Sequence, residues 1–167
     1  MAQFRDYQPT DCAALLAIYN HAICHSSATF EESPISLSEF AARLSAIQAH
    51  YPILVLEHDG KLQGYAYGNH YKPRSAYRFC AETTIYLHQD CRGTGLGQLL
   101  YQALFTRLQA QGIEQLLAIV TRPNEQSAGF HQRLGYEQVG VMRRVGYKFN
   151  RWYDVAIYQK SLIESAS

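Results

Sequence analysis

Charge of either sign is scarce in this sequence. Its 167 residues include 15 lysines and arginines against 14 aspartates and glutamates, which leaves a formal net charge of +1. Nucleic acids and anionic membranes are bound through clustered basic side chains, and no such excess is present. The composition therefore argues against a nucleic-acid or membrane partner.

Long apolar runs, a signal peptide and paired cysteines are missing as well. No stretch approaches the roughly 20 apolar residues of a membrane span, and the start, Met-Ala-Gln-Phe-Arg-Asp, lacks the basic and apolar regions of a signal peptide. The four cysteines form no Cys-x-x-Cys pair, and no glutamate follows His21 as in a His-Glu-x-x-His motif with His25. We therefore expect a cytoplasmic protein with free thiols and no metal.

The sequence does contain enough apolar material for one sizeable core. Hydrophobic residues make up 47% of the chain, and its 13 tyrosines suit pocket walls and subunit interfaces. Because no linker, repeat or low-complexity segment interrupts it, we expect residues 1–167 to form a single domain.

Hydrophobic periodicity and turn signals predict mixed strands and helices. Asp59-Gly60 is a hairpin signal, and the antiparallel first half that it implies favours an α+β protein over a doubly wound one. The expected strands are residues 3–7, 53–57, 61–69, 77–87, 116–121, 136–142 and 152–159, and the expected helices begin at Thr10 or Asp11, at the capping box Ser36–Glu39, at Leu96, and at Asn124 or Ser127.

The most informative motif is the glycine loop Arg92-Gly93-Thr94-Gly95-Leu96-Gly97, between a predicted strand and a predicted helix. A glycine-rich turn at a helix start presents unpaired backbone N–H groups and the positive end of the helix dipole, which suits phosphate or pyrophosphate. Glycine permits close approach of the backbone, and Arg92 adds a fixed positive charge.

Other interpretations of this loop fit less well. A P-loop would end in Gly-Lys-Ser/Thr, whereas Gly97 is followed by Gln98 and Leu99, and a dinucleotide fingerprint would need glycine at position 98. A glycine-rich turn without a ligand is the plain alternative. The remaining match is the pattern Arg/Gln-x-x-Gly-x-Gly/Ala, which Arg92, Gly95 and Gly97 satisfy.

In this loop the chain resembles the GNAT superfamily of N-acetyltransferases, whose loop holds the pyrophosphate of acetyl-CoA. Further stretches resemble one branch, the phosphinothricin (methionine sulfoximine) N-acetyltransferases. The resemblance runs from about Phe4 to Tyr158 and is carried by Ile18–His21, Ala76–Arg78, Ala81–Glu82, Thr84–Leu87, Arg133–Tyr136 and Gly146–Trp152.

The resemblance implies an α+β GNAT fold, in which four helices flank a central, twisted, mixed but mostly antiparallel sheet of about seven strands. It implies acetyl-CoA as co-substrate, direct transfer, a small-molecule amine or amino-acid acceptor, and a homodimer. For this branch the expected acceptor is the α-amino group of a small amino acid or analogue of the methionine sulfoximine, methionine sulfone or phosphinothricin type.

Glu82 is the candidate general base. On the predicted strand 77–87 it shares a face with Arg78 and Tyr86. A carboxylate in a largely uncharged strand is costly unless it is paired or hydrated, so a structural pair with Arg78 or another basic residue is the alternative. The resemblance favours catalysis, in which the carboxylate removes a proton from an ammonium substrate.

His131 is the second catalytic candidate. It lies seven residues after Asn124, where many members of the superfamily have a tyrosine that protonates the departing thiolate. A histidine titrates near neutral pH, so its role as acid, base or orienting group is left open. The alternative is a histidine on the helix surface without a catalytic role. In that case Tyr136 is the other candidate for protonating the thiolate, through its hydroxyl.

The resemblance also implies the cofactor contacts. The pantetheine arm inserts between the strand that ends at Leu87 and strand 116–121, where backbone atoms of Ile85 and Leu87 bond it. Asn124 is expected to bond the cofactor, with a helix cap as the alternative. The full expected set is Ile85, Tyr86, Leu87, Arg92, Gly93, Thr94, Gly95, Leu96, Gly97, Gln98, Asn124 and Ser127.

Arg74 and Arg78 are the candidates for acceptor recognition. Paired arginines suit a carboxylate or phosphinate through bidentate hydrogen bonds, and solvated surface arginines are the alternative. With Phe30, Glu82 and Tyr86 they complete the expected acceptor site.

Three other functions remain open from the sequence. The acceptor could be a polyamine, an aminoglycoside or a protein N-terminus, although a polycation would favour an acidic pocket. A non-catalytic acetyl-CoA sensor is a second class, which Glu82 and His131 argue against. Acetylation of aminoacyl-tRNA is a third, which the near-neutral charge disfavours.

Overall fold

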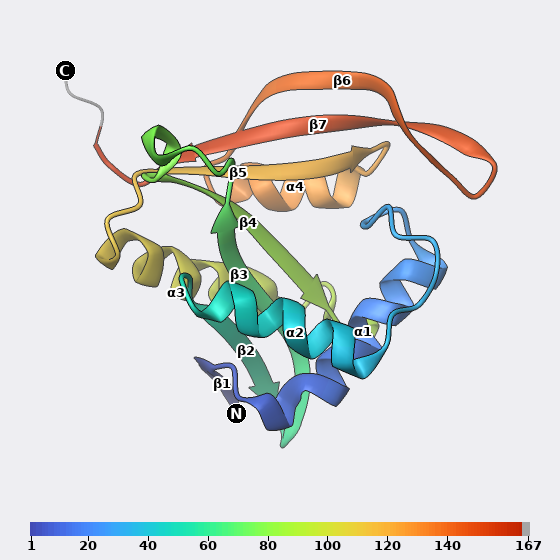
Figure 1. Cartoon of the computed structure of the whole chain (residues 1–167), viewed down its shortest axis with the longest axis vertical. Coiled ribbons are helices and arrows are strands. Elements are labelled where there is room, and N and C mark those ends of the chain that lie inside the picture. Colours follow the sequence, from blue (N-terminus) through green and yellow to red (C-terminus); the bar gives the residue numbers. More distant parts are fainter. Residues whose placement is uncertain (165–167) are drawn as a thin grey trace.

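The computed structural model describes residues 1–164 as a seven-stranded sheet with helices on both faces (Figure 1). The strand order is β1-β2-β3-β4-β5-β7-β6, and only the β4–β5 pair is parallel. The strands are β1 (Ala2–Asp6), β2 (Ile53–His58), β3 (Lys61–His70), β4 (Cys80–Leu87), β5 (Gln115–Arg122), β6 (Glu137–Lys148) and β7 (Arg151–Ser161), and the helices are α1 (Cys12–His25), α2 (Leu37–Gln48), α3 (Leu96–Ala110) and α4 (Glu125–Arg133). The expected α+β architecture is confirmed.

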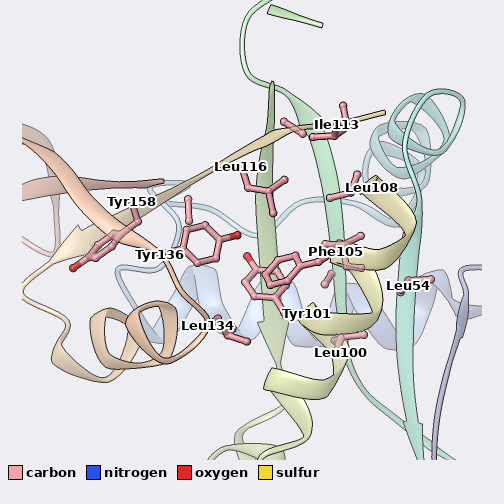
Figure 2. Packing of buried hydrophobic residues seen from close by; sticks show 14 of the residues in the cluster. Leu54, Leu100, Tyr101, Phe105, Leu108, Ile113, Leu116, Leu134, Tyr136 and Tyr158 are labelled. Carbon is pink, nitrogen blue, oxygen red and sulfur yellow. The ribbon is translucent and has the colours of Figure 1, made fainter. Parts of the chain in front are cut away.

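Each face of the sheet has its own hydrophobic core, because successive strand residues point to opposite faces. On β2, Leu54 and Leu56 pack in the core beneath α3, whereas Ile53 and Val55 pack in the core beneath α1 and α2. The α3 core is rich in tyrosine: Figure 2 shows Tyr136 between Tyr101 on α3 and Tyr158 on β7. The hydroxyl of Tyr136 lies 2.6 Å from Oγ1 of Thr83 on β4, so this core is tied to the strand that carries Glu82.

The strand expected at residues 77–87 begins three residues later than predicted. Ser75–Tyr77 forms a 3₁₀ turn, in which the Arg78 N–H donates to the Ser75 carbonyl at 3.1 Å, and β4 starts at Cys80. The alternation of faces predicted for Glu82 and Tyr86 is kept. Arg78 lies outside the strand and does not share their face.

The last two strands are longer than predicted. β6 was expected to end at Met142 but runs to Lys148, and it returns through a two-residue turn at Phe149 and Asn150, where both φ angles are positive (54° and 59°). Such turns usually contain glycine, so no hairpin signal is visible in the sequence at this position. The resulting β6–β7 hairpin projects past the rest of the sheet toward the chain that follows α1 (Figure 1).

α1 begins directly after the predicted capping residues and runs through His25. Asp11, the residue directly before α1, is only 5% exposed and accepts two hydrogen bonds of 2.9 Å from the Arg5 guanidinium and one of 2.8 Å from the Gln8 N–H. No helix within residues 1–164 has both the length and the apolar composition to cross a membrane.

We expect Arg5→Met to lower the free energy of unfolding by about 1–3 kcal/mol at neutral pH, because it leaves a buried carboxylate without its cation. Arg5 holds the pKa of Asp11 below its ordinary value, so the pair stabilises the fold above the unfolded pKa and this contribution is lost on acidification. Urea unfolding at pH 7 and at about pH 3 measures both effects.

Arg107→Met is the matched control, because Arg107 pairs with Asp6 at 2.8 Å on the exposed surface. Such pairs contribute about 0–1 kcal/mol. Equal destabilisation by the two substitutions would contradict a special role for the buried pair.

Candidate functional site

The site lies where the two parallel strands separate. Cys80, Ala81 and Glu82 on β4 pair with residues 115–117 of β5, and beyond them β5 pairs only with β7 on its other side. From Thr83 onward, the β4 edge that faces β5 has no strand partner within the described residues. An extended ligand can add to such an edge as a strand would.

A cavity of about 550 Å³ opens at this separation. One wall comes from α1 and the chain after it, and the other from the glycine loop and α4. The lining residues are Ile18, His21, Ala22, Ser26, Ser27, Ala28, Ile85, Tyr86, Leu87, Cys91, Arg92, Gly93, Gly95, Gly97, Gln98, Asn124, Gln126, Ser127, Phe130, His131 and Arg133.

The glycine loop has the geometry of an anion site. Gly93 and Gly95 have positive φ angles of 77° and 81°, which side chains disfavour, and Gly95 lies directly before the first turn of α3. A Cβ on Gly97 would lie 2.7 Å from Cδ1 of Leu87, so any other residue there would displace the Leu87 side chain where α3 approaches β4. The free N–H groups of the α3 N-terminus thus lie beside the β4 edge and Arg92.

Of the twelve residues expected to bind the cofactor, ten line the cavity, and Thr94 and Leu96 do not. Thr94 instead braces the loop, since its hydroxyl donates to the Cys91 carbonyl at 2.6 Å and accepts from the Leu96 N–H at 3.3 Å. Asn124 caps α4 through the Ser127 N–H at 3.1 Å while also lining the cavity, so the alternative of a helix cap and the cofactor role are compatible.

His131 lies in the cavity wall with only 5% of its surface exposed, so the surface alternative is wrong. Its Nδ1 lies 2.8 Å from the Ser127 carbonyl, which can only accept, so Nδ1 carries the proton and Nε2 the lone pair. Burial among aromatic rings lowers its pKa, and the carbonyl contact opposes this only in part. The resting ring is therefore neutral, and the geometry favours proton acceptance at Nε2 over donation.

Glu82 is the last residue of β4 that pairs with β5 and is not itself part of the cavity lining. It is half-buried, and its carboxylate has no hydrogen bond or ion pair to any other described side chain. Burial therefore raises its pKa. The predicted alternative of a pair with Arg78 is wrong, because Arg78 donates to the Ser75 carbonyl at 3.1 Å and lies over the Phe79 ring at 4.4 Å.

The other acceptor candidates do not reach this cavity. Arg74 and Arg78 are exposed on the loop that precedes β4, at the opposite end of that strand from the glycine loop. Phe30 packs against the β6–β7 hairpin, although its neighbours Ser26 to Ala28 do line the cavity. Of the acceptor set, Tyr86 alone lies in the lining.

Several lining residues were missed from the sequence. Gln126, Phe130 and Arg133 follow one another at i, i+4 and i+7 on α4, a spacing that could have identified the face of that helix turned to the cavity. Ile18, His21 and Ala22 stand at i, i+3 and i+4 on α1, which is the same kind of spacing, whereas Cys91 and the stretch Ser26–Ala28 gave no comparable signal.

Comparison with known proteins agrees with this geometry. Residues 4–157 match the family model of the acetyltransferase (GNAT) domain. The chain is 43% identical to a phosphinothricin N-acetyltransferase of Alcaligenes faecalis over 91% of this chain and 78% of that protein. It is 39% identical to an L-methionine sulfoximine/L-methionine sulfone acetyltransferase of Pseudomonas paraeruginosa, over 96% and 95% respectively.

Solved structures give the same result. A phosphinothricin acetyltransferase of Sinorhizobium meliloti in complex with acetyl-CoA superimposes with a TM-score of 0.93 at 37% identity, over 96% of this chain and 88% of that chain. An N-acetyltransferase of Staphylococcus aureus superimposes with a TM-score of 0.94 at 34% identity, over 98% and 99%.

We expect Arg92→Ala to weaken acetyl-CoA binding by about 1.5–3 kcal/mol, the contribution of one charge-assisted hydrogen bond. Gly95→Val should weaken it as well, because valine at φ 81° distorts the loop. Isothermal titration calorimetry measures both. Gly112→Val is the matched control, since Gly112 also has a positive φ (98°) but lies after α3, outside the cavity lining. Unchanged affinity in both loop variants would exclude the loop from the site.

We expect His131 to be neutral at pH 7, with the proton on Nδ1 and a pKa below the ordinary value of about 6.5. Long-range ¹H–¹⁵N correlation spectra distinguish the two tautomers and the charged ring, and His131→Phe assigns the signals. A ring that is protonated at pH 7, or one that carries its proton on Nε2, would contradict the geometry.

Proposed function

This chain belongs to the GNAT family of acetyltransferases, and we propose that it acetylates the α-amino group of a small amino acid or analogue of the methionine sulfoximine, methionine sulfone or phosphinothricin type. The observation that carries the proposal is the cavity where β4 and β5 separate, with an anion-binding loop at one side and two ionisable groups, Glu82 and His131, on the elements around it. Relatives that carry these activities match nearly the whole chain.

The residues present fit acetyl-CoA as co-substrate, which supplies the acetyl group as a thioester. The glycine loop and Arg92 would hold its pyrophosphate, and the unpaired β4 edge at Ile85 and Leu87 would bond its pantetheine amides. Asn124 and Ser127 complete this wall.

Glu82 and His131 divide the proton transfers. An acceptor amine must lose a proton before or as its nitrogen bonds the acetyl carbon and the carbon–sulfur bond breaks. Glu82, whose pKa is raised, acts as the base, through ordered water because it is not in the lining itself. As the carbon–nitrogen bond forms, the lone pair on Nε2 of His131 would accept the second proton of that nitrogen, and the charged ring would pass it to the sulfur as the carbon–sulfur bond breaks. The first proton, taken by Glu82, is released to solvent.

The acceptor is recognised through its acid end. The loop before β4 lies outside the cavity, but Glu82 lies on β4 between the two, so an acceptor whose amine is at Glu82 can direct its acid end toward this loop. The loop carries Lys72, Arg74 and Arg78 without a single acidic residue between His70 and Cys80, so it favours an anion. A polyamine or an aminoglycoside would be repelled there, which makes these the weaker alternatives. Tyr86, which lies in the cavity lining, supplies apolar surface for the acceptor side chain, and Phe30 packs behind the wall formed by Ser26 to Ala28.

The proposed assembly is a homodimer in the cytoplasm. β6 is an edge strand, and the hairpin exposes a group of large apolar side chains, a common feature of subunit interfaces. These are Val139, Met142, Val145, Tyr147, Phe149 and Trp152, which are 41–55% exposed.

We expect Glu82→Gln to lower turnover about 10²–10⁴-fold at neutral pH, with a smaller defect at high pH, where more of the amine is free.

Glu82→Gln should also raise the melting temperature at neutral pH. The pKa of Glu82 is higher in the folded protein than in the unfolded chain, so its carboxylate disfavours folding above the folded pKa, and the effect vanishes below the unfolded pKa. Initial rates and thermal unfolding test both; parental turnover would refute Glu82 as the base.

The acceptor class is tested with a panel of amines and acetyl-CoA. We expect turnover of methionine sulfoximine or methionine sulfone, and weak or no turnover of spermidine and kanamycin. The decarboxylated amine of a good substrate should be much poorer, because it leaves the cationic loop unpaired. Arg78→Ala should raise the acceptor KM and leave the acetyl-CoA KM nearly unchanged. Equal activity on the acid and its decarboxylated amine would refute recognition of the carboxylate.

A further inference from the structure

Lys148 is a buried lysine that the transfer reaction above does not use. It ends β6, beside the hairpin turn, and only 2% of its surface is exposed. Its ammonium donates to the carbonyl oxygens of Ser26 and Thr29, both at 2.8 Å, although these residues are more than 100 positions away in the sequence. Burial lowers the pKa of the ammonium, because the charged group has lost most of its hydrating water.

The same segment of the hairpin holds the chain after α1 in a second way. The ring of Phe30 packs directly on Gly146, where a Cβ would overlap it, and lies 6.1 Å from the Tyr153 ring. Gly146 and Lys148 point to one side of β6, because they are two residues apart. Two hydrogen bonds and one aromatic contact therefore fix residues 26–30 to the hairpin, as the approach of the two segments in Figure 1 shows.

The acidic residue nearest in the sequence to this loop is already paired. Both oxygens of Glu31 accept from Arg43, at 2.6 and 2.9 Å, and the Tyr19 hydroxyl bonds Glu31 and Thr29. The loop is thus fixed to α1 and α2 on its inner side. On its outer side Lys148 bonds backbone carbonyls, so its role is to hold the chain in place.

The held loop is also a wall of the cavity. Ser26, Ser27 and Ala28 line it on the side opposite the glycine loop and α4. We propose that Lys148 is a positioning residue for the acceptor: through the Ser26 and Thr29 carbonyls it fixes the wall against which the acceptor binds. This inference rests on the proposed function, and it predicts an effect on the acceptor that the acetyl-CoA side does not share.

The test is Lys148→Met, which keeps an unbranched chain of similar length and removes the donors. We expect the acceptor KM, measured with methionine sulfone, to rise roughly tenfold or more, while the acetyl-CoA KM stays within about twofold. Hydrogen exchange of the peptide that contains residues 26–31 should become faster. Lys61→Met, an exposed lysine at the β2–β3 turn, is the control and should change neither quantity.

Gly146→Ala is a second variant, which displaces the Phe30 ring and leaves Lys148 intact. It should raise the acceptor KM in the same selective way. Equal rises in both KM values, or unchanged exchange of residues 26–31 in Lys148→Met, would overturn the proposal. If the parent protein acetylates no amino-acid analogue, the proposed function fails instead, and the exchange comparison still decides whether Lys148 holds the loop.

Discussion

The separation of β4 from β5 is the constraint on which the site depends. If β4 and β5 stayed paired along their whole length, their backbone groups would bond each other, and no strand edge would remain for a ligand. Here three residue pairs, ending at Glu82 and Leu117, hold the strands together, and β5 then follows β7. α3 begins at the open end of this gap, where Gly97 lies against the Leu87 side chain, so the glycine loop faces the unpaired strand edge.

Three partly buried carboxylates differ in whether a cation offsets the loss of their hydration. Asp11 and Glu31 are carboxylates with pKa values below the ordinary value, because Arg5 and Arg43 bond them. Glu82 has a raised pKa because desolvation acts on it without a cation. A paired carboxylate stabilises the fold and is a poor base, whereas an unpaired one destabilises the fold and holds a proton more readily.

The sequence predicted the order of the elements and the part of the cavity lining that the end of β4 and the glycine loop form, because these depend on local signals. Hydrophobic periodicity, the capping box at Ser36 and the glycine loop each act within a few residues, and the loop was recognised by its resemblance to a family. The acceptor wall depends on tertiary contacts: Ser26, Ser27 and Ala28 line the cavity because a hairpin more than 100 residues away holds them. The end of β6 was missed because its turn residues, Phe149 and Asn150, adopt positive φ angles without glycine.

The register of the β6–β7 hairpin decides which of its side chains are buried and which are exposed, because successive strand residues point to opposite faces. Gly146 and Lys148 are buried against residues 26–30, while Val145 and Tyr147 are half-exposed on the other side. A shift of one residue in the β6–β7 register would turn Lys148 outward and release the loop. Any protein surface that packed on the exposed side, such as that of a second copy, would fix the register and with it the acceptor wall. The apolar side chains of the hairpin, and not only its lysine, therefore bear on how precisely an acceptor is held.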